Sequence, residues 1–175
     1  MSEICIYVKL PTYLKQWFVN VYSGEPVHLE RGSAETVILR QNLAKWPEGT
    51  LPEKQKEDEV AICIPTFKSG PDPRYYNYLP PRAINLLATT IRNNFLIQFN
   101  VEMSTFVRRG GEQQDAVYAY MERHGIEQNE TNYLALAKIF ARSRFAYLQD
   151  KRRAKKSNQN CQKNHSDFRN KKINV

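Results

Sequence analysis

Lysine and arginine residues crowd the C-terminal end of this sequence, where they could neutralise a polyanion. Residues 142–175 hold 11 Lys/Arg and two Asp, which leaves this end with a net charge of +9. Residues 1–141 hold 15 basic and 16 acidic residues, so the +8 of the whole chain comes from its end. Such asymmetry favours a polyanionic partner, with nucleic acid first and an anionic membrane surface second. A charged end that only keeps the protein soluble is the plain alternative.

The candidate nucleic-acid-binding residues are the cations at the end of the last predicted helix, with one further cation two turns earlier. They are Arg144, Lys151, Arg152, Arg153, Lys155 and Lys156. Cations along a helix end can lie against successive phosphates and release counterions, so binding should weaken as salt rises. Phosphate contacts position a protein but carry no sequence information. The cluster therefore predicts binding without base specificity.

A helix-turn-helix is a second candidate for nucleic-acid binding. Helices predicted at 112–124 and 130–150 flank a connection that contains Gly125, and a turn glycine is typical of this motif. Four polar residues near the start of the second helix could reach base edges: Gln128, Asn129, Thr131 and Asn132. Glu127 and Glu130 lie in the same place and would repel phosphates. A plain helical hairpin inside the domain core is the favoured interpretation.

A loop with alternating charge and aromatic rings is a third candidate. Its residues are Lys68, Arg74, Tyr75, Tyr76 and Tyr78. Single-stranded nucleic acid could stack on such rings. The favoured alternative is that the tyrosines pack the loop onto the helices while their hydroxyl groups reach water.

Catalytic and metal-binding motifs are missing from the sequence. The three histidines are His28, His124 and His165, and the three cysteines are Cys5, Cys63 and Cys161. No Cys-x-x-Cys or His-x-x-x-His pair is present, so a zinc site would need residues that the fold brings together. Cys5 and Cys63 lie in apolar runs, where a reduced thiol acts as a small hydrophobic group. The sequence predicts no enzyme, no cofactor and no metal site.

Strand and helix patterns alternate in the first part of the chain. Strands are predicted at 3–10, 26–30 and 59–67, and helices at 11–22 and 34–45. The first strand is apolar on both faces, which predicts that both faces are buried. Gly24 is placed to end the first helix, and Ser33 to begin the second as its N-cap.

From about residue 81 the pattern becomes helical. A helix predicted at 81–107 should break near Asn100, because asparagine is a weak helix former. The fold class is therefore α+β, with a small strand-helix-strand-helix-strand sheet followed by three helices and a basic tail. We expect one domain at 1–150 and a disordered basic tail at 151–175.

Three segments resemble small uncharacterised proteins encoded on mobile elements and prophages of Bacteroidetes. They read ICIYVKLPTYLKQWF, VAICIPTF and AYMERHGIEQNETNYLALAKIFARSRFAYLQDKRR. The resemblance covers most of residues 3–153 and implies no activity and no residue roles. It implies a setting in which accessory nucleic-acid-binding proteins occur.

The sequence thus predicts a non-enzymatic, cytoplasmic accessory or regulatory protein that binds nucleic acid. It predicts no membrane span, because no apolar run approaches roughly 20 residues. The alternative is a protein-interaction or assembly module. In that case the aromatic residues at 75–78, with Trp17 and Phe18, would contact a protein partner or a second copy of the chain. A basic face continuing from Arg144 would make the tail one arm of a larger site, whereas a mixed face would leave the tail to act alone.

Overall fold

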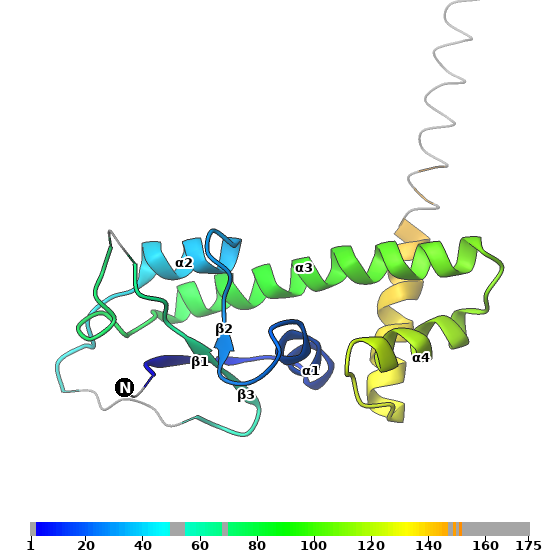
Figure 1. The fold of residues 1–175 in the computed structure, drawn as a ribbon. Helices are drawn as coiled ribbons and strands as arrows, with labels where there is room; N and C mark the ends of the chain where they lie inside the picture. Colours follow the sequence, from blue (N-terminus) through cyan, green and yellow to red (C-terminus); the bar gives the residue numbers. More distant parts are fainter. Residues whose placement is uncertain (1–2, 50–54, 68–69, 147–148, 150, 152–175) are drawn as a thin grey trace, which may run out of the picture. The chain divides into compact units, whose positions relative to one another are not determined.

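A computed structural model describes residues 3–49, 55–67, 70–146, 149 and 151 of the chain (Figure 1). The chain divides into an N-terminal unit, Met1–Tyr133, and a C-terminal unit, Leu134–Val175. The expected division into a domain at 1–150 and a tail at 151–175 stays a prediction. The α+β class is confirmed, since a small sheet is combined with helices in the order that the sequence predicts.

The sheet has three strands, β1 (Cys5–Lys9), β2 (Val27–His28) and β3 (Glu59–Cys63), with β3 in the middle. β1 pairs antiparallel with β3, whereas β2 pairs parallel with it. Ile62 lies opposite both Ile6 and Val27, and all three side chains are buried. Because side chains alternate between faces along a strand, this row marks the core face of the sheet.

The prediction that β1 is buried on both faces is wrong. Ile6 and Val8 are buried on the core face, whereas Cys5 and Tyr7 on the other face are half-buried and Lys9 is exposed. The strand order explains the difference, since β1 lies at an edge of the sheet. The central strand β3 carries the apolar residues that are buried on both faces, including Ala61 and Cys63.

The N-terminal unit contains four helices, α1 (Thr12–Val21), α2 (Ala34–Asn42), α3 (Pro81–Arg108) and α4 (Gln113–Arg123); α1 and α2 alternate with the strands, and α3 and α4 follow β3. Residues 130–146 are also helical. Ser33 is the N-cap of α2 as predicted, and its hydroxyl accepts a hydrogen bond from the Thr36 backbone N–H. After α1 both Ser23 (φ 61°) and Gly24 (φ 146°) have a positive φ, and Gly24 donates its N–H to the Val19 carbonyl five residues back, which ends the helix.

The long helix α3 organises the core of the N-terminal unit. It contacts α1, α2, α4 and β1 (Figure 1). Its buried stripe is Ala83, Leu87, Ile91, Phe95, Phe99 and Met103. The predicted break near Asn100 is wrong, because the stripe continues through Phe99 and Met103 and packing outweighs the weak helix propensity of asparagine.

Candidate functional site

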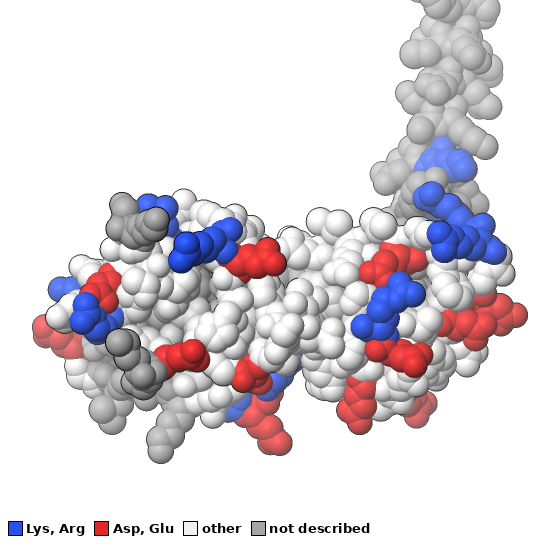
Figure 2. Space-filling model, in the orientation of Figure 1, with Lys and Arg blue, Asp and Glu red and all other residues white. Residues whose placement is uncertain are grey.

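The helix at 130–146 presents exposed cations, and one of them, Arg144, is a predicted binding residue. Lys138, Arg142 and Arg144 are exposed on it, and Lys151 is exposed in a helical position further on. Among the described residues, none of these four forms an ion pair, and residues 134–146, 149 and 151 include no acid. Figure 2 shows basic side chains on the described end of this helix. Arg152, Arg153, Lys155 and Lys156 lie outside the described residues.

The N-terminal unit has a mixed surface. Residues 1–133 hold 14 Lys/Arg and 16 Asp/Glu, and red and blue side chains are interspersed on the face shown in Figure 2. Several cations are paired, since Arg74 binds Asp72 at 2.8 Å and Arg123 binds Glu102 at 3.0 Å. Of the two alternatives, a basic face that continues from Arg144 and a face of mixed charge, the N-terminal unit has the face of mixed charge.

Two residues of the predicted helix-turn-helix are committed to the fold. Asn129 accepts a hydrogen bond from the Asn132 N–H through its Oδ1 at 2.8 Å, as an N-cap does. Asn132 is 2% exposed, and its Nδ2 donates to Gln16 Oε1 at 3.1 Å and to the Glu127 carbonyl at 3.0 Å. Neither side chain can read a base edge without breaking these bonds, so the recognition-helix hypothesis is wrong for both.

The aromatic loop is divided between packing and exposure. Tyr78 packs against Trp46 at a ring distance of 5.0 Å, and Lys45 lies over the Tyr76 ring at 5.6 Å. Tyr75 is 66% exposed. Packing thus holds two of the three rings, and Lys68 lies outside the described residues. The alternative surface at Trp17 and Phe18 is wrong, since these side chains are 4% and 1% exposed and belong to the core.

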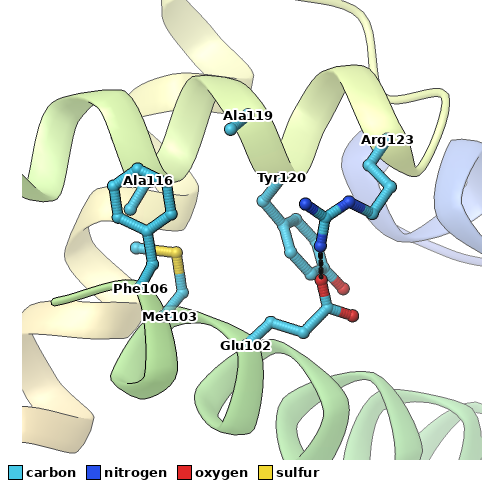
Figure 3. A pocket seen from close by; sticks show the side chains of 7 residues that line it. All are labelled: Glu102, Met103, Phe106, Ala116, Ala119, Tyr120 and Arg123. Carbon is cyan, nitrogen blue, oxygen red and sulfur yellow. Dashed lines mark hydrogen bonds and ion pairs between the residues drawn. The ribbon is translucent and has the colours of Figure 1, made fainter. Parts of the chain in front are cut away.

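A carboxylate lies between α3 and α4, where Glu102 contacts His124 and Arg123. His124 Nε2 lies 3.0 and 3.1 Å from its two oxygens, Arg123 donates to Oε2 at 3.0 Å, and Gln98 donates to Oε1 at 3.2 Å. Figure 3 shows Glu102 and Arg123 joined at the mouth of a small pocket that Phe106 and Tyr120 also line. Its volume of about 20 Å³ has room for a single water molecule.

The electrostatics of this cluster favour a structural ion pair. Burial is the largest influence on the pKa of Glu102 and raises it, but the hydrogen bonds from His124 and Gln98 and the charges of His124 and Arg123 outweigh it. The pKa of Glu102 therefore lies below its ordinary value. Burial, then the nearby Glu102 charge, raises the pKa of Tyr120, which stays a neutral phenol.

Glu102→Gln should make the protein less sensitive to acid. A lowered folded pKa contributes stability that is complete above the unfolded value of about 4.3 and is lost as pH falls through the folded pKa. We expect E102Q to lose roughly 1–2 kcal/mol of unfolding free energy at pH 7, and less below pH 4. Urea denaturation at both pH values measures this. Glu122→Gln, at an exposed position on α4, is the matched control and should stay within about 0.5 kcal/mol at each pH.

An open groove lies beside α1. Its volume is about 680 Å³, and Lys15, Gln16 and Glu25 are among its lining residues. Lys15 donates to the Glu57 and Glu59 carbonyls at 3.1 and 2.7 Å, so the cation of the groove is already engaged. The prediction that the protein is not an enzyme stays a prediction.

A mixed cluster of thiol, imidazole and carboxylate groups lies at the outer face of the sheet. Cys5 Sγ and Cys63 Sγ are 3.4 Å apart, and Cys63 Sγ is 3.3 Å from Glu3 Oε2. His28 Nε2 is 3.6 Å from Glu3 Oε1. Burial, then hydrogen bonds with Cys5 and Glu3, raises the pKa of the Cys63 thiol, so without a metal it is protonated. Glu3, His28 and Cys63 have donor atoms within 4.8 Å of one another, which is close enough for a metal ion.

Because the apolar runs around Cys5 and Cys63 indicate small hydrophobic groups, this cluster was not predicted from the sequence. Half of the signal was visible, since Glu3 and Cys5 are two residues apart and share one face of a strand. The partners from β2 and β3 depend on strand register, which the sequence did not define.

Comparison of the chain with known proteins finds no similar protein. No protein-family model matches the chain, and no curated protein or solved structure is significantly similar to it. None of the described helices combines the length and the apolar composition needed to cross a bilayer.

Proposed function

We propose that this protein binds nucleic acid through phosphate contacts made by its basic C-terminal unit, as a non-enzymatic accessory or regulatory protein. The segregation of charge carries the proposal. The C-terminal unit holds 12 Lys/Arg and two Asp, whereas the N-terminal unit holds 14 Lys/Arg and 16 Asp/Glu. Arg142, Arg144 and Lys151 are exposed on helical backbone, as contact with a phosphate chain requires.

The mixed surface of the N-terminal unit supports binding without base specificity. Phosphate contacts give affinity on any sequence, whereas base readout needs side chains placed at groove edges. Asn129 and Asn132, which could have served as such readers, are held in the fold. Affinity for unrelated duplexes should therefore be similar. A reducing cytoplasmic setting on a mobile element belongs to the same proposal and is supported by the resemblance and by the free thiols of Cys5 and Cys63.

Titration of a labelled DNA duplex at two salt concentrations tests the function. Arg142→Gln with Arg144→Gln should weaken binding and lower the slope of log K against log salt by about 1.8, since each lost phosphate contact lowers it by about 0.9. Deletion of residues 150–175 should weaken binding further.

The matched control removes two exposed arginines of the N-terminal unit, Arg31→Gln with Arg82→Gln. It should leave affinity and slope unchanged. Absence of binding at low salt, or binding that survives deletion of residues 150–175 intact, would end the proposal.

A protein-interaction module is the second candidate, favoured by apolar side chains on the outside of α3. Ile97 is 66% and Val101 is 62% exposed, one turn apart on the same face of the helix. Light scattering separates the candidates, because a salt-independent dimer that ignores DNA favours this second function.

A further inference from the structure

Strand register gathers four potential metal ligands on the outer face of the sheet. Cys63 of the central strand lies opposite Cys5 of β1 and opposite His28 of β2. Glu3 precedes Cys5 by two residues and reaches the same group, with one oxygen near Cys63 and the other near His28. Residues from three different parts of the chain thus meet at one point.

The spacing of the donor atoms fits a tetrahedral metal. With metal–sulfur bonds of about 2.3 Å and metal–nitrogen or metal–oxygen bonds of about 2.0–2.1 Å, neighbouring ligand atoms lie about 3.3–3.8 Å apart. The observed separations are 3.4 Å between the two sulfurs, 3.3 Å from sulfur to carboxylate and 3.6 Å from imidazole to carboxylate. The donor atoms of Glu3, His28 and Cys63 all lie within 4.8 Å of one another, and Cys5 Sγ adjoins them through its 3.4 Å contact with Cys63 Sγ, so Cys5 would turn toward the other three to become the fourth ligand.

The chemistry of the donors selects the metal. Two thiolates, an imidazole and a carboxylate suit zinc, whereas calcium and magnesium prefer oxygen ligands throughout. A disulfide between Cys5 and Cys63 would leave the convergence of His28 and Glu3 without a role. We propose that Cys5, Cys63, His28 and Glu3 form a zinc site that ties the three strands together.

The position of the site explains what the metal would do. β2 has only two residues and is held by a short stretch of parallel pairing, helped by a hydrogen bond from the Ala61 N–H to Glu25 Oε1 at 2.8 Å. Zinc bound by His28 and Cys63 fastens this short strand to the central one. Four protein ligands leave no open position, which is the arrangement of structural rather than catalytic zinc. Binding displaces the thiol protons, because thiolates are the ligands.

Cobalt titration of the full-length protein, reduced and stripped with chelator, tests the site. Co²⁺ should bind one to one and give the visible bands of a tetrahedral ion with a thiolate charge-transfer band, and Zn²⁺ should bleach both. Zinc should also raise the thermal unfolding midpoint. Cys63→Ser should weaken binding by more than the roughly 10–100-fold that follows loss of an outer-shell partner.

Two further variants keep the test decisive. His28→Gln changes a side chain that is 64% exposed, so it should fold even if the buried Cys63 variant does not, and it should also lose the tetrahedral spectrum. Cys161→Ser is the matched control and should bind as the unchanged protein does. Octahedral cobalt bands, equal loss in the Cys161 variant, or a Cys5–Cys63 disulfide that persists under reducing purification would overturn the site.

Discussion

Replacing Phe95 with alanine should lower the free energy of unfolding by about 3–5 kcal/mol, because it empties the centre of the aromatic core. Phe95 is fully buried, and its ring lies 5.3 Å from Trp17, 5.5 Å from Phe99 and 6.1 Å from Tyr120. The neighbours belong to three helices that cannot collapse onto the cavity together. The free energy of unfolding of a domain of this kind is roughly 5–15 kcal/mol, so the expected loss is a large share of it.

Guanidinium denaturation followed by circular dichroism measures this loss. The denaturation midpoint should fall while the dependence of the unfolding free energy on denaturant concentration stays constant. Ile97→Ala is the matched control on the same helix, since Ile97 is 66% exposed, and should change the free energy by less than about 0.5 kcal/mol. Phe95→Leu covers the case in which the alanine variant does not fold, and should cost roughly 1–2 kcal/mol. Equal effects in F95A and I97A would contradict the central place of Phe95.

The second large effect concerns Asn132→Asp, a change of nearly constant shape. The side-chain amide of Asn132 is buried and donates to two oxygens, on Gln16 and on the backbone of Glu127. The aspartate would bring a negative charge against both acceptors with no donor to offset it. We expect a loss of about 3–5 kcal/mol at pH 7, as for a buried charge without a partner.

The loss should shrink as pH falls, because protonation removes the buried charge and gives the carboxyl group one donor. Unfolding midpoints at neutral and mildly acidic pH measure this. Gln128→Glu adds the same charge at an exposed position of the same connection and should have little effect. If N132D is no less stable than Q128E at neutral pH, Asn132 is not the buried amide described above.

Local patterns were sufficient to predict the helices and strands. The spacing of apolar residues in α3 and α4 and the β-branched run of β3 are properties of short windows, so they can be read without knowing the fold. Ser33 was likewise recognisable, because an N-cap depends on its own turn. The basic end was visible by counting charges, and its role stays a prediction.

The failures share a different cause, which is tertiary packing. Asparagine at position 100 favours a break only in an isolated helix, and the neighbouring Phe99 and Met103 are fixed by burial in the core. The grouping of Glu3 and Cys5 with His28 and Cys63 depends on a parallel pairing of two residues across a long stretch of chain. No local pattern specifies such a register.

The central position of β3 and the length of α3 delay the packing of the first segments of the chain during synthesis. β1, α1, β2 and α2 all leave the ribosome before the strand and the helix against which they pack. Until Glu59–Cys63 has emerged, neither edge strand has a partner, and until Pro81–Arg108 follows, Leu14, Trp17 and Phe18 have no core to enter. The nascent N-terminal half therefore exposes apolar surface until these later segments have emerged, and it is prone to aggregation during that time.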